Sequence, residues 1–113
     1  MYYYRGLANY NIQDYTKAAD DFTQAITLGD QHKDLTYWVA SADYMLGKYE
    51  NAVKNYTSYL QQTPDSGDGF FWRGNSYYKL NQMSQAISDV NKALEIDPTN
   101  ETYLTFKKDT LKK

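Results

Sequence analysis

Apolar and small residues recur along the chain at intervals of three or four, and this spacing predicts helices. One such stripe, in residues 69–80, consists of Phe70, Gly74, Tyr77 and Leu80. The same pattern predicts helices in pairs, and a short polar break separates the two members of each pair. The expected first helices are 2–12, 35–46 and 69–80, and the expected second helices are 15–28, 49–61 and 83–96.

The predicted helix pairs repeat with a constant period. Ala18, Ala52 and Ala86 lie 34 residues apart on the second helices, and most of their neighbours repeat with them. Small residues recur on the first helices too, at Gly6, Ala40 and Gly74. Small side chains on both helices let their backbones approach closely, and larger ones would cost roughly 1–3 kcal/mol. The period indicates stacked copies of one module.

This pattern resembles the tetratricopeptide repeat, whose unit has 34 residues, small residues in both helices, several aromatic positions and a closing proline. The middle unit carries Ala40, Tyr44, Gly47, Tyr49, Ala52, Tyr56, Leu60 and Pro64. The resemblance covers residues 1–98. It implies an all-α, right-handed α-solenoid of three helix-turn-helix hairpins plus one terminal helix, about seven helices in all. The first helices would line a concave groove.

The resemblance also divides the chain. We expect repeats at 1–32, 33–66 and 67–100, followed by a C-terminal capping helix at 101–113 in which Leu104 and Leu111 occupy core columns. Ser66 and Asn100 are expected to cap helices. Met1 begins inside the first helix without a capping residue, so we expect either a piece of a longer array or a frayed start.

Several positions depart from the repeat. Asn9 and Asp43 stand in the column of Tyr77, which predicts that these two sites are either more hydrated or bonded to a polar partner. Side-chain sizes are reciprocal in two facing columns, and we therefore expect contacts across unit boundaries. The expected pairs are Ala25 with Leu35, Tyr59 with Gly69, and Ala93 with Tyr103.

Composition narrows the function classes. The net charge of −2 and the pI of about 5.2 argue against nucleic-acid binding and against a polybasic membrane anchor. No apolar run approaches the roughly 20 residues of a membrane helix, and no signal peptide is apparent. The compartment stays open, with the cytoplasm slightly favoured. There is no cysteine, so disulfides and thiol chemistry are absent.

The sequence offers little for catalysis. His32 is the one histidine, and a lone histidine in a loop is seldom catalytic. Asp65, Ser66 and Asp68 lack the spaced carboxylates of a calcium loop, so helix capping is the better interpretation. We therefore expect no enzyme activity, no cofactor and no metal.

Aromatic residues make up 17% of the chain, and many fall beside the buried stripe of the first helices. The family resemblance implies that these positions face the concave surface and contact a ligand. The candidate groove residues are Tyr3, Tyr4, Tyr10, Tyr37, Trp38, Ser41, Tyr44, Met45, Phe71, Trp72, Asn75, Tyr78 and Lys79. The alternative is that many of these rings pack against neighbouring first helices.

The resemblance implies a protein-interaction scaffold that binds a peptide segment or helix of a partner. One family subtype grips acidic chaperone tails with Lys, Asn and Arg. The matching positions here are Tyr3, Leu7, Trp38, Asp68 and Trp72, which disfavours an acidic ligand. With Asp34 and Asp68 at the groove edge, a neutral or basic partner with apolar anchors is expected.

Two alternatives remain open. The chain could be a structural spacer or self-association module of a longer array, docking through its uncapped first helix. A weaker alternative is carbohydrate binding, because Trp and Tyr also stack on sugars.

Overall fold

The computed structural model describes residues 2–110, so the roles expected of Met1 and Leu111 lie outside the described residues. Seven helices occur within residues 2–110: α1 (Tyr2–Asn11), α2 (Tyr15–Thr27), α3 (Leu35–Met45), α4 (Tyr49–Gln62), α5 (Gly67–Lys79), α6 (Met83–Ile96) and α7 (Glu101–Asp109). The predicted ends of the first six helices agree with these bounds to within two residues.

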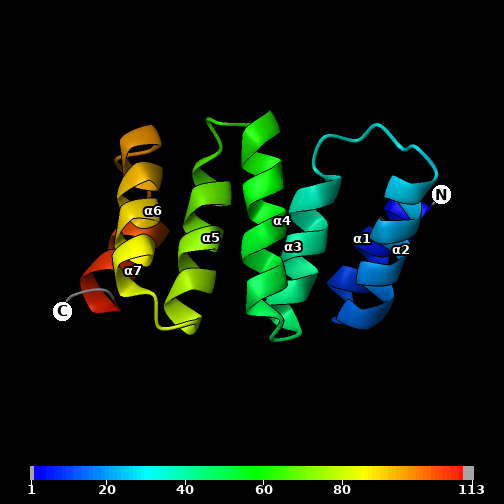
Figure 1. Cartoon of the computed structure of the whole chain (residues 1–113), viewed down its shortest axis with the longest axis horizontal. Coiled ribbons are helices and arrows are strands. Elements are labelled where there is room, and N and C mark those ends of the chain that lie inside the picture. Colours follow the sequence, from blue (N-terminus) through cyan, green and yellow to red (C-terminus); the bar gives the residue numbers. More distant parts are fainter. Residues whose placement is uncertain (1, 111–113) are drawn as a thin grey trace.

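The helix pairs stack in chain order along one axis, as Figure 1 shows, with the pair α1 and α2 at one end and α7 at the other. The molecule is accordingly elongated and measures 42 × 24 × 21 Å. Its buried apolar residues form three successive clusters along the axis. The predicted all-α repeat architecture is confirmed.

Within each repeat, the two helices meet at a seam of small residues. We define this seam as Gly6 and Ala18, Ala40 and Ala52, and Gly74 and Ala86. The three second-helix alanines and Ala40 have no exposed surface. A Cβ atom on Gly6 would lie 2.7 Å from the Phe22 ring, and one on Gly74 would lie 3.2 Å from the carbonyl oxygen of Ala86. The predicted close approach of the paired helices is confirmed.

The turn inside each repeat has one recurring geometry. Gln13, Gly47 and Asn81 are equivalent and have φ values of 68°, 79° and 62°. In the first repeat, the N–H of Asp14 donates to the carbonyl of Asn9 at 2.8 Å, and the other two turns have the same bond. Each of these helices therefore ends at a residue in the left-handed backbone conformation. Glycine adopts this conformation without steric cost, whereas glutamine adopts it at a cost.

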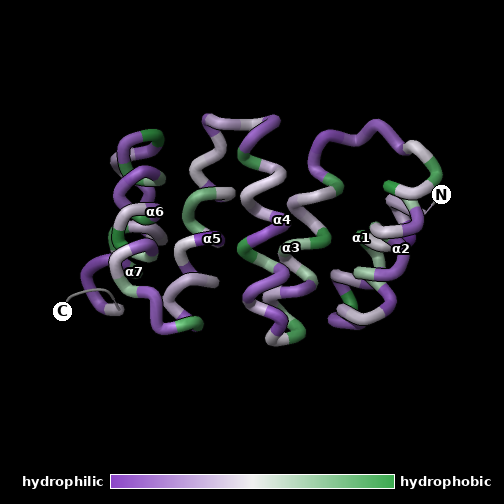
Figure 2. The backbone as a smooth tube through the Cα atoms, viewed as in Figure 1, coloured by the Kyte–Doolittle hydropathy of each residue, from purple (hydrophilic) through white to green (hydrophobic). Residues whose placement is uncertain are grey.

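Polar residues start helices as expected. The hydroxyl of Ser66 accepts from the N–H of Gly69 at 3.0 Å, and the Asn100 side chain accepts from the N–H of Tyr103 at 3.1 Å. Both predicted caps are confirmed. The segment between α2 and α3 is mostly hydrophilic, as Figure 2 shows.

The contact expected between Tyr59 and Gly69 is also confirmed. A Cβ atom on Gly69 would lie 3.2 Å from the Tyr59 ring and 2.8 Å from the end of the Leu60 side chain, so a larger residue there would require these neighbours to shift. The other two expected pairs, Ala25 with Leu35 and Ala93 with Tyr103, each share a buried cluster.

The core role expected of Leu104 is wrong, because this side chain is 44% exposed. Its equivalent in the third repeat, Phe70, packs into the cluster shared by α5 and α6. Within the described residues no helix follows α7, so Leu104 has no such neighbour. α7 instead buries Tyr103 in that cluster and packs Phe106 against it.

Candidate binding groove

The first helices enclose a small cavity where the three repeats meet. Its volume is about 110 Å³, and its lining residues are Tyr10, Tyr37, Trp38, Ser41, Tyr44, Met45, Tyr56 and Trp72. We call this the central cavity. All of these except Tyr56 are groove candidates from the sequence. Side chains of α1, α3 and α5 therefore converge on one site, with one contribution from α4.

The two tryptophans also connect neighbouring repeats. The Trp38 ring lies 5.2 Å from the Tyr10 ring, and the Trp72 ring lies 5.5 Å from the Tyr44 ring, both edge to face. These two pairs are equivalent across the repeat. Edge-to-face pairs add to stability beyond their buried area. The tryptophans thus pack between repeats and line the cavity at once.

Two polar groups of the central cavity pair with each other. The hydroxyls of Ser41 and Tyr56 lie 2.8 Å apart and are buried. Burial raises the pKa values of Tyr56 and Tyr37, and the nearby Asp68 adds to the shift at Tyr37. Both phenols are therefore neutral at pH 7, and the lining carries no formal charge. Tyr56 was missed because its column on the second helix was interpreted as scaffold only.

At the N-terminal end of the groove, the Tyr3 side chain contacts other residues of the protein. Its hydroxyl donates to both carboxylate oxygens of Asp34, at 2.9 and 3.0 Å, and its ring stacks on His32 at 3.8 Å. Burial, together with the Asp34 carboxylate, raises the pKa of Tyr3 to about 12. The indole N–H of Trp38 also donates to Asp34, at 3.0 Å. Tyr4 is 64% exposed and remains accessible.

At the C-terminal end, α7 covers part of the predicted surface. Phe71 is buried, with its ring 4.7 Å from that of Tyr103 and 5.4 Å from that of Phe106. The Tyr78 ring also lies near Phe106, at 5.9 Å. Lys79 is exposed and lines neither this region nor the central cavity.

A second, larger cavity of about 630 Å³ lies between α5 and α7. We call it the α5–α7 groove. It is lined by Phe71, Trp72, Asn75, Glu101, Thr102, Thr105, Phe106, Asp109 and Thr110. Trp72 lines both cavities, so the two are adjacent. The contribution of α7 was not predicted, because this segment was interpreted only as a capping helix.

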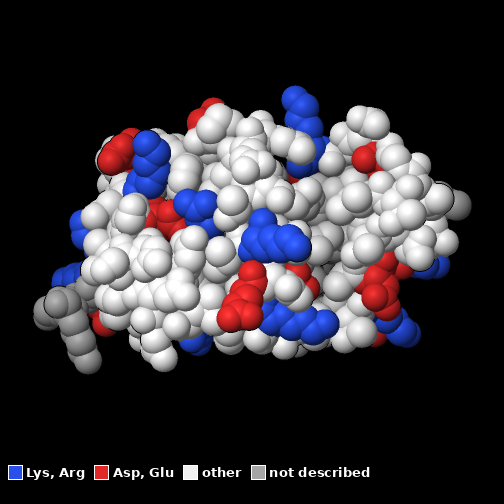
Figure 3. All heavy atoms as spheres, in the orientation of Figure 1, with Lys and Arg blue, Asp and Glu red and all other residues white. Residues whose placement is uncertain are grey.

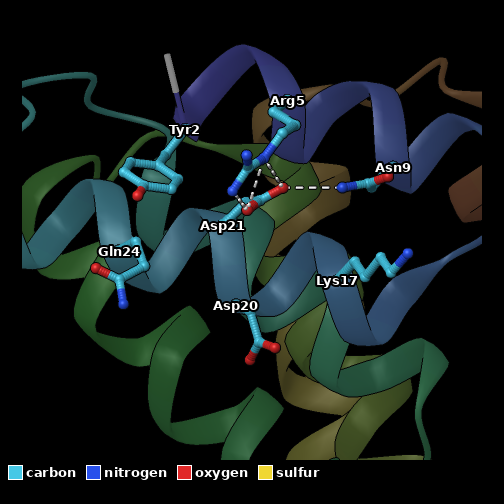
Figure 4. Close-up of a pocket in the computed structure, with 7 residues that line it drawn as sticks. All are labelled: Tyr2, Arg5, Asn9, Lys17, Asp20, Asp21 and Gln24. Atoms are coloured by element: carbon cyan, nitrogen blue, oxygen red, sulfur yellow. Dashed lines mark hydrogen bonds and ion pairs between the residues drawn. The ribbon is translucent and has the colours of Figure 1, made fainter.

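A different face carries ion pairs. In the first repeat, Arg5 donates to Asp21 at 2.8 Å, and the Asn9 amide donates to the same carboxylate at 2.8 Å (Figure 4). The third repeat has an equivalent pair, Arg73 with Asp89, at 2.8 Å. None of these residues lines the central cavity or the α5–α7 groove.

In the middle repeat the aspartate lies on the first helix, and its partner lies on the second helix. The Asn55 amide donates to Asp43 at 2.9 Å, and Val39 stands in the column of the two arginines. Of the two alternatives expected for Asn9 and Asp43, hydration or a polar partner, the structure shows the polar partner at both sites. The arginine pairs were missed, although the sequence carries a signal for them: arginine occurs in the repeats that have an aspartate 16 residues later.

Charge is distributed without a dominant sign on the face shown in Figure 3, where basic and acidic side chains are interspersed among large uncharged areas. No group of three or more metal-ligating His, Cys, Asp or Glu side chains occurs among residues 2–110. None of the helices in that range is both long and apolar enough to span a bilayer.

Comparison with known proteins gives family and structural matches. Residues 34–66 and 67–100 each match a family profile described as tetratricopeptide repeat. A search among curated protein sequences finds no significant match.

Solved structures share the fold. The Arabidopsis OM64 TPR domain is 23% identical, with a TM-score of 0.89, over 95% of this chain and 88% of that one. The second TPR domain of human RPAP3, in complex with the HSP70 peptide SGPTIEEVD, is 25% identical, with a TM-score of 0.87, over 96% and 90%. The first TPR of Spaghetti (RPAP3), bound to the HSP90 peptide SRMEEVD, is 20% identical, with a TM-score of 0.86, over 92% and 82%.

Proposed function

This chain belongs to the tetratricopeptide repeat family, and we propose that it binds a peptide segment of a partner protein in the aromatic groove of its first helices. We assign repeats to 1–32, 33–66 and 67–100, with 101–113 as the capping segment. The proposed role is binding and not catalysis. His32, the one histidine, is stacked on Tyr3 and bonded to Asp30 at the edge of the groove.

The central cavity is the observation that carries this proposal. It is uncharged, the hydroxyls of Ser41 and Tyr56 bond to each other, and the rest of its lining is five further aromatic side chains and Met45. Such a lining favours an apolar side chain. Aromatic anchors surrounded by other contacts are typical of the energetic centres of protein interfaces.

The chemistry of the partner follows from the charges beside the cavity. The RPAP3 domains are described with peptides that end in Glu-Glu-Val-Asp. Here Asp34 bonds to the indole of Trp38, and the Asp68 charge acts on Tyr37, so carboxylates stand next to the aromatic lining. Like charges repel across an interface. A neutral or basic segment with apolar anchors therefore fits better than an acidic tail.

Selection of binders from a displayed library of random 12-residue peptides tests this proposal. Met45 is 47% exposed and lines the cavity, so Met45→Arg blocks the site without disturbing the core. Ile12→Arg is the matched control, because Ile12 is 73% exposed and lines neither the central cavity nor the α5–α7 groove.

We expect selected peptides to lose about tenfold or more in affinity for Met45→Arg and to keep their affinity for Ile12→Arg, because truncating an interface centre typically costs more than 1 kcal/mol. Equal affinity for both variants would place binding elsewhere. If no peptide is selected and the protein self-associates with rising concentration, the self-association alternative replaces this proposal.

A further inference from the structure

The α5–α7 groove has an aromatic floor. Phe71 lies near two other rings, with the Trp72 ring 5.2 Å away and the Phe106 ring 5.4 Å away. All three rings line the groove. Its volume of about 630 Å³ leaves room for a long side chain and part of a peptide backbone.

The wall of this groove is acidic. Glu101 and Asp109, both exposed on α7, are the charged side chains of the lining. The lysines of the same helix, Lys107 and Lys108, do not line it. The charged side chains of the lining are therefore both negative, and they share the groove with three aromatic rings.

A buried acceptor completes the lining. Asn75 is only 7% exposed, and its amide N–H donates to the Phe71 carbonyl at 2.9 Å. No hydrogen bond from any other residue in the 2–110 range reaches its carbonyl oxygen. Among residues 2–110, every side-chain polar atom that is fully buried has a hydrogen-bond partner. The Asn75 oxygen has no such partner, so it is not fully buried and retains some accessible surface. An amide oxygen can accept a bond from a ligand N–H.

Aromatic faces, carboxylates and a free amide oxygen together favour a cation that carries several N–H donors. We infer that the α5–α7 groove takes a basic side chain of the bound peptide, arginine in preference to lysine. A guanidinium stacks on aromatic rings and donates in several directions at once, which an ammonium does less well. This inference rests on the proposed function, and it adds the identity of one ligand side chain and its position.

A small probe tests the inference without a known partner. We would titrate the ¹⁵N-labelled protein with butylguanidinium chloride at constant ionic strength and follow its amide and indole signals. We expect saturable shifts in α5 and α7 and in the indole signal of Trp72. Sodium pentanoate, an anion of similar length, is expected to cause no saturable shift there. Equal responses to the two probes, or no response to the cation, would overturn the inference.

Paired variants test the role of the carboxylates. Glu101→Gln with Asp109→Asn removes both charges from the wall. Asp20→Asn with Glu50→Gln is the matched control, because both residues are exposed, line other surfaces and change the net charge by the same amount. We expect about three- to tenfold weaker probe binding in the first variant only, since each exposed ion pair contributes modestly. Equal weakening in the control would reduce the effect to net charge and overturn the inference.

The peptide selection separates this inference from the proposed function. Selected peptides that require the central cavity but show no enrichment of arginine or lysine would leave the proposed function standing and overturn the inference. Conversely, probe binding in the α5–α7 groove with no selected peptide would support a cation site while the proposed function failed.

Discussion

The seam and the central cavity draw on the same helices but use opposite kinds of side chain. On α3, Ala40 has no exposed surface and lies in the seam, whereas the next residue, Ser41, lines the cavity. The seam excludes volume, since a Cβ atom on Gly6 would strike the Phe22 ring. The cavity instead surrounds empty space with rings. The difference shows that scaffold and surface alternate along one helix, so mutations in each should affect different properties.

Enlarging the seam gives the largest expected effect. Ala52→Leu adds three carbon atoms at a position with no exposed surface, so overpacking should lower the free energy of unfolding by about 1–3 kcal/mol or more. Urea unfolding followed by circular dichroism measures the loss. Ala8→Leu is the control, because Ala8 is exposed on α1. Alanine and leucine have similar helix propensities, so the exchange itself should cost little there. Similar losses in both variants would contradict the seam.

Acid titration should distinguish Asp21 of the first repeat from Asp43 of the second. Bonds from Arg5 and Asn9 hold the pKa of Asp21 below its ordinary value, so its stabilising contribution is present above about pH 4 and is lost as the pH falls further. Burial raises the pKa of Asp43, where Val39 replaces the arginine, so protonation in acid relieves a cost there.

The two aspartates should therefore respond to pH with opposite signs. Relative to the parent protein, Asp21→Asn should be clearly less stable at pH 7, and the difference should shrink below about pH 4. Asp43→Asn should be almost as stable as the parent protein at pH 7. In acid, where Asp43 of the parent is protonated, the variant should be less stable relative to the parent than it is at pH 7. Urea unfolding at pH 7, 5 and 3 measures both. Parallel pH profiles for the two variants would show that the arginine does not control the charge state.

The turn glycine gives the smallest expected effect. Gln13→Gly should raise the free energy of unfolding by a few tenths to about 1 kcal/mol, because Gln13 holds a left-handed φ of 68°. Gly47→Gln, at the equivalent position, should lower it by a similar amount. Thermal unfolding measures both changes, and neither should alter peptide affinity. Changes of the same sign in the two variants would contradict an equivalent turn geometry.

Most of the fold could be predicted from the 34-residue period. It predicted the helices and the small residues of the seam because each repeat meets an almost identical neighbour. The reciprocal sizes of Tyr59 and Gly69 predicted a contact for the same reason. Because the environment repeats, a change of side-chain size in one column predicts a matching change in the column that it contacts.

The ends of the groove were harder to predict, because their neighbours do not repeat. Tyr3 is held by His32 and Asp34, which lie in the connection between α2 and α3 and at its end. Phe71 is covered by Tyr103 and Phe106 of α7. Column comparison gives no information about such partners. The middle of the groove has a repeat on either side, and there the structure brings the candidate residues together around one cavity.

The most direct test of the central claim, that ligand binding belongs to the groove and not to the ion-pair face, is a nuclear magnetic resonance titration with one selected peptide. The indole N–H signal of Trp38 reports on the central cavity, and that of Trp72 reports on the central cavity and the adjacent α5–α7 groove. The amide signals of Arg5, Asp21 and Asp89 report on the ion-pair face. We predict that the peptide shifts both indole signals in a saturable manner and leaves those amide signals in place. Shifts confined to the ion-pair face, with both indole signals unchanged, would contradict the account.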